Sequence, residues 1–361
     1  MKAKRVAAGS ALALSGVGFL AYGIGWAVSA PGYKGEKSDH FDGKMFHNLK
    51  PLSRQRGKDF LNWMLSREPG KWPDWIDAKP GPKPPERVGR GELRTTFVGH
   101  ACVLVQMDGM NFLTDPHYSE RTSPVSWVGP RRRRPPGIRF EDLPPIDAVL
   151  VSHNHYDHLD IPTLQRLAKE HRLKIFTGLG NSQLLESSGI QNSKDLDWWQ
   201  GVELTPEIRV TFVPAQHFSS RGLADRNQTL WGGFVIEGPA GKVYFAGDTG
   251  MGPHFEMIRE KFGEMRLALL PIGAFNPSWF MGPVHTSPEE AVEAHKILGA
   301  AHSIPIHYGT FPLADDSYEQ PLEALEKALV AANLSNPAFK VVPEGEGWDV
   351  PETREPEPSS K

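Results

Sequence analysis

Apolar and polar positions change their pattern three times along the 361 residues. Residues 6–30 are apolar or small and carry no charge, whereas residues 31–90 show no regular period and are rich in Pro, Gly and Trp. From Leu93 onwards, short apolar runs typical of strands mix with longer amphipathic segments typical of helices. We therefore divide the chain into a hydrophobic segment at 1–30, a segment at 31–90 that wraps over a surface, a folded domain at 91–345 and a polar tail at 346–361.

The body begins with strands that form hairpins and continues with alternating strands and helices. Strands are predicted at 93–98, 101–107, 111–114, 147–151, 208–213, 232–237, 242–246, 267–271 and 302–306, and helices at 161–171, 253–262, 287–298 and 317–333. Asp108-Gly109 is a hairpin signal, and Ser287 with the acidic residues after it supplies the start of a helix. This mixture fits α/β layers around packed sheets in one domain.

The N-terminal hydrophobic segment is long enough to cross a bilayer. Lys2, Lys4 and Arg5 precede the uncharged stretch Val6–Ala30, and a membrane-spanning helix needs about 20 apolar residues. This pattern predicts an N-terminal membrane anchor, with the basic end in the cytoplasm and the body on the periplasmic or extracytoplasmic side. The small residues at 28–30 leave open a cleaved signal peptide, and a buried core helix is the third alternative.

Composition narrows the classes of function. Cys102 is the single cysteine, which excludes an intramolecular disulfide framework and a Cys-rich metal site. Forty Lys and Arg residues against 43 Asp and Glu residues give a net charge of −3. The chain therefore lacks the charge pattern of a nucleic-acid-binding protein, and we expect no nucleic-acid partner.

Three histidines and an aspartate fall within six residues directly after a predicted strand. His153, His155, Asp157 and His158 form the pattern H-x-H-x-D-H after the apolar run 147–151. A loop at the end of a buried strand is fixed by the sheet and open to solvent, which suits a catalytic site. Imidazoles two residues apart can converge on one ion, while Asp157 and His158 can turn toward a second ion. The spacing favours a metal site over a chance cluster of polar residues.

Two metal ions need further ligands, and three residues just beyond later apolar runs are candidates. They are His217, Asp248 and His307. A carboxylate can bridge two cations, and the glycines around Asp248 let the backbone approach a metal closely. Histidine and aspartate suit Zn²⁺, although iron and manganese accept the same ligands. We predict two Zn²⁺ ions, which would hold a hydroxide ready for attack.

These seven residues at these distances resemble the metallo-β-lactamase superfamily. The resemblance implies an α/β fold, specifically an αββα four-layer sandwich with a two-zinc site at one edge. It also implies that His153, His155 and His217 hold one zinc and that Asp157, His158 and His307 hold the other. Asp248 would bridge the two ions.

A longer set of motifs resembles one family, the N-acyl-phosphatidylethanolamine-hydrolysing phospholipases D. The matching stretches cover roughly residues 40–340 and are FDGKMFHN (41–48), FVGHACVLVQMDGMNFLTDP (97–116), LPPIDAVLVSHNHYDHLD (143–160), LDWW (196–199), PAQHF (214–218), TLWGGF (229–234), FAGDTG (245–250), PIGAFNPSWFM (271–281), SPEEAV (287–292) and IHYGTF (306–311). Two features depart from the family. Val284 stands where a polar residue is expected before His285, and the N-terminal hydrophobic segment is not expected from the animal members.

The family resemblance implies a zinc-dependent phosphodiesterase of phospholipase D type. Such an enzyme hydrolyses N-acyl-phosphatidylethanolamine-like phospholipids to phosphatidic acid and an N-acylethanolamine, by direct attack of zinc-bound hydroxide. We assign catalytic roles to Asp157 and His285. His285 is one candidate for the proton donor to the leaving alkoxide, and a metal-bound water is the other. An ordinary polar surface role is the alternative for His285.

A lipid substrate must leave the bilayer to reach the site, so we expect a phospholipid and a membrane surface as partners. The candidate residues of an apolar entrance, for which core packing is the alternative, are Trp72, Trp75, Trp127, Trp279, Phe280 and Met281. The basic run Arg131–Arg134 is either a solvated loop or a site that attracts anionic lipid. The family resemblance makes a homodimer plausible.

Other functions compete with this one. A lactonase or a small-molecule phosphodiesterase of the same fold would keep the metals but would need neither an apolar entrance nor an anchor. A nuclease is disfavoured by the acidic body, and a β-lactamase explains neither the Trp-rich segments nor the anchor. A tethered scaffold is disfavoured because all seven ligands are present. Outside these seven, His100 is a candidate to orient a metal ligand.

Overall fold

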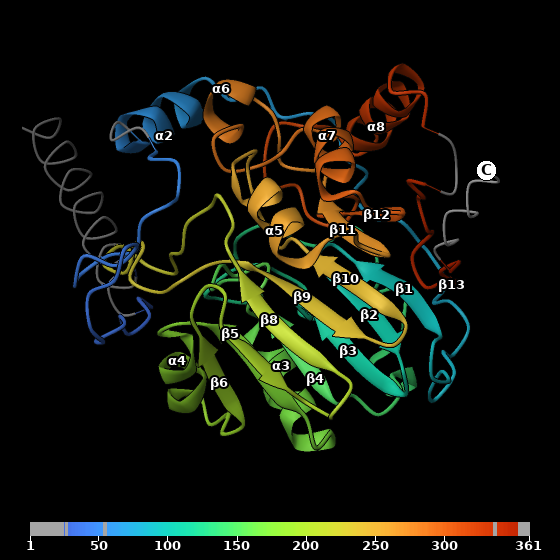
Figure 1. The fold of residues 1–361 in the computed structure, drawn as a ribbon. Coiled ribbons are helices and arrows are strands. Elements are labelled where there is room, and N and C mark those ends of the chain that lie inside the picture. Colours follow the sequence, from blue (N-terminus) through green and yellow to red (C-terminus); the bar gives the residue numbers. More distant parts are fainter. Residues whose placement is uncertain (1–24, 26–27, 53–55, 335–337, 353–361) are drawn as a thin grey trace, which may run out of the picture.

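Two mixed β-sheets lie face to face at the centre of the protein (Figure 1). The computed structural model describes residue 25 and residues 28–52, 56–334 and 338–352. The seven-stranded sheet has the order β13 (Gly347–Asp349), β1 (Leu93–Gly99), β2 (Cys102–Met107), β3 (Met110–Thr114), β4 (Ala148–Val151), β5 (Lys174–Gly178) and β6 (Ser193–Leu196). The six-stranded sheet has the order β12 (His302–Ile306), β11 (Leu267–Pro271), β10 (Gly241–Phe245), β9 (Gly233–Gly238), β8 (Arg209–Val213) and β7 (Gly201–Glu203).

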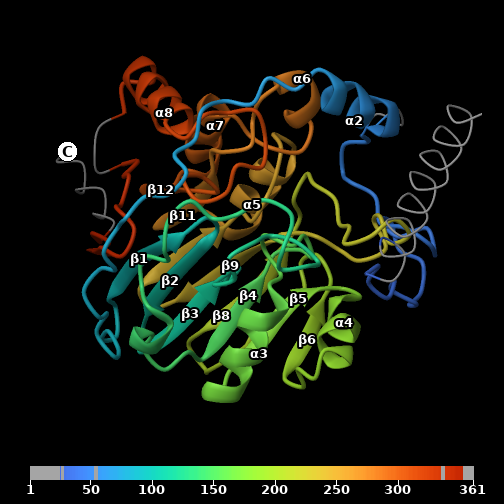
Figure 2. The same ribbon diagram turned by 180° about the vertical axis from the view of Figure 1, so that it is seen from behind.

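Helices cover the outer face of each sheet (Figures 1 and 2). On the side of the seven-stranded sheet lie α3 (Ile161–Glu170) and α4 (Asn181–Ser187). On the side of the six-stranded sheet lie α5 (His254–Phe262), α7 (Pro288–Leu298) and α8 (Gln320–Ala331). This arrangement is the αββα four-layer sandwich, so the predicted fold class is confirmed.

The continuous apolar runs arise because both faces of the central strands are covered. In β2, Val103, Val105 and Met107 belong to the cluster between the two sheets, which also contains residues of β8 to β12. Cys102 and Leu104 point to the other face and pack in the cluster that contains Leu164 and Leu167 of α3. Side chains alternate between the faces of a strand, and neither face of β2 meets water, so no polar alternation is visible in its sequence.

The Asp108-Gly109 hairpin is confirmed. β2 and β3 pair antiparallel with Met107 opposite Met110, and the two residues between them have φ values of +51° and +79°. Positive φ at both central positions is the geometry of a type I′ turn, which follows the twist of the flanking strands and favours Asp-Gly.

The predicted start of the helix at 287–298 is also confirmed. The Ser287 hydroxyl accepts a hydrogen bond from the Glu290 amide, and the Glu290 carboxylate accepts one from the Ser287 amide. The two interactions form a capping box, which satisfies two amides that the helix itself leaves without partners.

Ser287→Ala should therefore lower the free energy of unfolding by about 1 kcal/mol, the usual cost of losing an N-cap hydroxyl. Urea unfolding followed by circular dichroism measures this change. Ser187→Ala is the matched control, because the Ser187 hydroxyl only bonds the carbonyl of Leu184 within its own helix. Equal stability of the intact protein and Ser287→Ala would contradict the assignment.

Some elements differ from the sequence-based expectation. Helix α2 (Arg56–Leu65) lies inside the segment predicted only to wrap over a surface, and the short helix α6 (Ser278–Met281) lies beside it in both views. Strands β5, β6 and β7 were not predicted. β6 has the polar sequence SKDL at the edge of its sheet, where only Leu196 is fully buried, so it carries no apolar run. Residues 347–349, placed by the sequence in a polar tail, form the edge strand β13.

The predicted membrane anchor lies mostly outside the described residues, at 1–24 and 26–27. Among the residues that the structure does describe, no helix has the length and apolar character needed to span a bilayer. The end of the predicted segment is held against the body: the Ala30 amide donates to Asp225, and the Ala224 amide donates to the Ser29 hydroxyl.

Candidate metal centre

All seven residues predicted as metal ligands come together at one edge of the sandwich, in loops that follow strands. His153 to His158 follow β4, His217 follows β8, Asp248 follows β10 and His307 follows β12. The turn before Asp248 depends on Gly247, which has a φ of +61°. A Cβ atom at Gly247 would stand 2.5 Å from Cβ of Ser152, the residue before His153. Glycine is required there because the loops of the two sheets touch.

The first group of ligands consists of His153, His155 and His217. Nε2 of His153 is 2.7 Å from Nδ1 of His155, which in turn is 3.3 Å from Nε2 of His217. One nitrogen of each ring therefore faces a common point, as required of three ligands to one ion.

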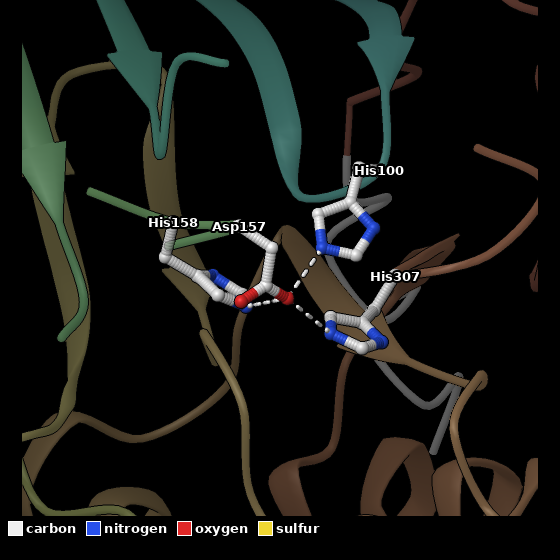
Figure 3. A group of neighbouring side chains, drawn as sticks. All are labelled: His100, Asp157, His158 and His307. Carbon is white, nitrogen blue, oxygen red and sulfur yellow. Dashed lines mark hydrogen bonds and ion pairs between the residues drawn. The ribbon is translucent and has the colours of Figure 1, made fainter. Parts of the chain in front are cut away.

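The second group consists of Asp157, His158 and His307, together with His100 (Figure 3). Oδ2 of Asp157 is 3.1 Å from Nε2 of His158 and 3.4 Å from Nε2 of His307. Nε2 of His100 is 2.9 Å from the same oxygen. His100 thus contacts a predicted ligand, as the sequence suggested, and its backbone carbonyl also accepts the amide of His307.

Asp248 lies between the two groups. Its Oδ2 atom is 3.2 Å from Nε2 of both His158 and His307, and 3.7 Å from Nε2 of His217. One carboxylate oxygen therefore contacts ligands from each group, which is the position of a residue that bridges two cations.

Burial and charge act in opposite directions on the pKa values of these side chains. Burial holds the pKa of His155 at about 4 and those of His153 and His217 well below the ordinary value, so these imidazoles are neutral and able to bind metal. Burial also acts against charge on His307, but the Asp248 and Asp157 carboxylates outweigh it and raise its pKa to about 9. Metal binding must therefore displace a proton from His307.

The donor atoms are placed to bind metal ions and not to form hydrogen bonds with other residues. Oδ1 of Asp248 and Nε2 of His158 and His307 are buried, yet they form no hydrogen bond of normal geometry with any described residue. Buried polar atoms without partners are costly. The seven nitrogen and carboxylate donors suit divalent metal ions, and these residues are the ones that would hold them.

A buried carboxylate that the sequence analysis missed orients one ligand. Oδ2 of Asp115 is 2.6 Å from Nδ1 of His158, and the same carboxylate accepts hydrogen bonds from the amide and hydroxyl of Ser152. This contact fixes the ring so that Nε2 faces the site. Asp115 directly follows β3 in the sequence FLTDP, and this position after a strand was the signal that could have identified it.

Asp115→Asn should weaken metal binding by about 10–100-fold, the usual effect of removing a partner of a ligating histidine. Metal content after dialysis against graded chelator concentrations measures the affinity. Asp74→Asn, at a fully exposed carboxylate outside the site, is the control. Unchanged metal retention by Asp115→Asn would show that the contact does not orient His158.

Two further residues hold the ligand loops. Nδ2 of Asn48, in the wrapping segment, donates to the His217 carbonyl, and its Oδ1 accepts from the His217 amide. Arg221 donates to the carbonyl of Asn154, within the H-x-H-x-D-H sequence, and to that of Leu159, just after it, and its guanidinium lies 3.9 Å from the centre of the Tyr156 ring. The segment 31–90 therefore supports the site as well as covering the surface.

His285 faces the same site. Its Nδ1 atom is 3.8 Å from Oδ2 of Asp248, and the two residues form a further possible ligand group with His217. Burial lowers the pKa of His285 to about 4, so the ring is neutral near pH 7. Val284, which departs from the family pattern, is used through its backbone: its carbonyl accepts a hydrogen bond from Nδ1 of His217.

A cavity of about 490 Å³ opens above the ligands. His155, Asp157, Asp248, His285 and His307 form its floor. Its walls are mainly apolar and are formed by Phe60, Trp63, Phe218, Ala274, Phe280, Met281, Val284 and Leu313. Such a cavity accepts a ligand with a polar reacting centre and an apolar body.

The predicted entrance residues divide into two sets. Phe280 and Met281 line the cavity, and Trp279 is exposed on α6 beside them. Trp72, Trp75 and Trp127 do not line it. The run Arg131–Arg134 is not a free cationic patch, because Arg132 is buried and donates to backbone carbonyls while Arg134 pairs with Glu344 at 2.7 Å.

Comparisons with known proteins relate the chain to a family and to a fold. Residues 110–308 match the model of the β-lactamase superfamily domain. The chain is 40% identical over 269 residues to N-acyl-phosphatidylethanolamine-hydrolyzing phospholipase D 1 of Caenorhabditis elegans, covering 71% of this chain and 76% of that one. It is 36% identical to an uncharacterized protein of Mycobacterium tuberculosis, over 95% and 96% of the two chains. The structure of Igni18, a metallo hydrolase of Ignicoccus hospitalis, aligns with a TM-score of 0.54 and 25% identity, over 73% of this chain and all of that one.

Proposed function

The chain is a metal-dependent hydrolase that belongs to the metallo-β-lactamase superfamily and to its family of N-acyl-phosphatidylethanolamine-hydrolysing phospholipases D, and we propose that it cleaves N-acylated phosphatidylethanolamine-like phospholipids. The products would be phosphatidic acid and an N-acylethanolamine. The proposed cofactor is a pair of Zn²⁺ ions held by the seven ligands. When bound, such ions make water nucleophilic near neutral pH and stabilise charge on the phosphoryl oxygens.

One observation carries the lipid assignment: the cavity above the ligands continues into an exposed apolar surface. Phe60 both lines the cavity and exposes 51% of its surface to solvent. We define the α2 face as the exposed apolar side chains of this helix, which are Phe60, Leu61, Met64 and Leu65. Their spacing places them together along the helix, and Trp279 of the neighbouring α6 is exposed as well. A water-soluble substrate would not need such a surface.

The α2 face is held firmly beside the cavity. On its buried side, Trp63 stacks on Phe280 with 5.1 Å between ring centres, and Nε1 of Trp63 donates to Asp315 at 2.9 Å. Arg67 lies over Trp63 and pairs with the same carboxylate. An amphipathic helix fixed in this way can enter the interface of a membrane without unfolding, so that a lipid can pass from the bilayer to the ligands. The proposed partner is therefore a membrane surface.

The chain's own residues support the chemical step in two ways. Asp157, held by His100, and Asp248 fix the positions of both ligand groups relative to the cavity. His285 is neutral and lines the cavity beside Asp248, so one of its ring nitrogens can donate a hydrogen bond to the oxygen of the leaving N-acylethanolamine. Cleavage on this side of phosphorus leaves the phosphate on the glycerol backbone.

The test is product analysis with the full chain loaded with zinc and N-acyl-phosphatidylethanolamine in mixed micelles. We expect phosphatidic acid and N-acylethanolamine from the intact chain and neither from an Asp157→Asn/His307→Ala variant. Turnover of only a soluble phosphodiester or of a lactone would keep the metal centre and refute the lipid assignment.

The N-terminal segment completes the proposal. The uncharged stretch 6–30 after three basic residues would anchor the chain in a membrane, with the body on the periplasmic or extracytoplasmic side. Protease treatment of intact cells or spheroplasts tests the location of the body. Protection of the body from protease added outside the cytoplasmic membrane would contradict it.

A further inference from the structure

Arg226 is the single Lys or Arg side chain among the residues that line the cavity above the metal ligands. Its guanidinium lies 4.2 Å from the centre of the Phe218 ring. Phe218 in turn contacts the imidazoles of His155 and His217, with ring centres 4.5 Å and 4.8 Å apart. The Phe218 ring therefore contacts both the Arg226 guanidinium and two histidines of the first group of ligands.

No carboxylate in the described part of the chain pairs with Arg226 or acts on its pKa. Arg226 is exposed to solvent, and partial burial of its guanidinium lowers its pKa without supplying an anionic partner from the protein. Most other arginines near the site are used structurally: Arg221 holds the ligand loop and Arg134 pairs with Glu344. An exposed cation that lies against an aromatic ring, lines a cavity and has no anionic partner is suited to bind an anion supplied by a ligand.

We propose that Arg226 is a binding residue for the phosphoryl group of the substrate, contacting a non-bridging oxygen of the phosphodiester and the phosphate of the product. A guanidinium presents several donors in a plane that matches two phosphoryl oxygens. This assignment rests on the proposed function. It adds that the cavity selects an anionic phosphodiester over a neutral ester or lactone, through charge at its wall.

The first test measures binding without turnover. Inorganic phosphate is titrated into the full, zinc-loaded chain by calorimetry, with Arg226→Gln, Arg226→Lys and Arg131→Gln as variants. Arg131 is a suitable control, because it also lies near an aromatic ring, Trp75 at 5.7 Å, but outside the cavity. We expect binding about tenfold or more weaker in Arg226→Gln, a smaller loss in Arg226→Lys and no change in Arg131→Gln. Equal binding in Arg226→Gln and the intact chain would overturn the proposal, as would no binding to the intact chain.

The second test separates recognition of charge from a structural effect. KM and kcat are measured for bis(4-nitrophenyl) phosphate, an anionic diester, and for 4-nitrophenyl acetate, a neutral ester. Arg226→Gln should raise KM for the diester about tenfold and leave the neutral ester unaffected. An equal loss on both substrates would mean that Arg226 only supports the fold, and the proposal would fail.

The outcomes also separate this proposal from the proposed function. If the intact chain does not cleave the lipid while phosphate binding still requires Arg226, the lipid assignment is wrong and the phosphoryl subsite stands. If the lipid is cleaved equally well by Arg226→Gln, with the same KM, the subsite is wrong and the lipid assignment stands.

Discussion

Asp248→Asn should reduce kcat by more than about 100-fold and lower the metal content toward one ion per chain. Oδ2 of Asp248 contacts ligands of both groups, so both lose a negative charge and a shared donor at once. Loss of a residue that only orients a ligand already costs about 10–100-fold, and loss of the bridging carboxylate should exceed that. Elemental analysis of the dialysed protein and turnover of a soluble phosphodiester measure the two effects.

The expected fall in metal content depends on charge as well as geometry. The buried His158 and His307 hold the pKa of Asp248 well below its usual range, although burial alone would raise it, so this residue is a carboxylate at any working pH. Asparagine keeps the shape but not the charge. Asp74→Asn should retain metal and activity. Two ions per chain and normal turnover in Asp248→Asn would show that Asp248 does not bridge them.

Leu61→Glu/Leu65→Glu on the α2 face should reduce turnover of lipid in vesicles by at least about 100-fold. Both side chains are exposed, at 58% and 79%, so the substitutions should not disturb the folded core. Burial of a leucine in an apolar environment is worth about 1.5–3 kcal/mol, and two such losses predict an effect of this size on membrane binding. Turnover of a soluble phosphodiester should be unchanged.

A matched substitution elsewhere separates a docking role from a general effect of surface charge. Val330 exposes 77% of its surface and belongs to α8, a helix that lies far from α2 in Figures 1 and 2. Val330→Glu should therefore behave like the intact chain on vesicles. If it loses as much activity as the α2 double variant, or if the double variant loses activity equally on the soluble substrate, the α2 face is not the docking surface.

The metal ligands were predictable because each of them lies in a loop that follows an apolar strand. The strands hold those loops rigidly, so local sequence decides which side chains reach the site, as in His153 to His158. Asp115 follows the same rule at the end of β3. It was missed because its partner is a histidine 43 residues away, a contact that only the pairing of β3 with β4 creates.

The cavity wall was harder to predict than its floor. Helix α2 packs through Trp63 and leaves its other large apolar side chains exposed, so its apolar positions do not identify the face that packs on the body. The sequence also does not show which basic residues are free to bind a ligand. The run Arg131–Arg134 is a basic cluster in the sequence, but tertiary contacts bury Arg132 and pair Arg134 with Glu344. Arg226 belongs to no basic run in the sequence, yet it is the arginine that lines the cavity.

Isotope labelling determines directly whether water attacks the phosphorus of an N-acylated phospholipid at this metal centre. The full, zinc-loaded chain is allowed to hydrolyse N-acyl-phosphatidylethanolamine in ¹⁸O-labelled water, and both products are analysed by mass spectrometry. We expect one ¹⁸O atom in phosphatidic acid and none in the N-acylethanolamine. Label in the N-acylethanolamine, or release of a labelled fatty acid in place of phosphatidic acid, would contradict it.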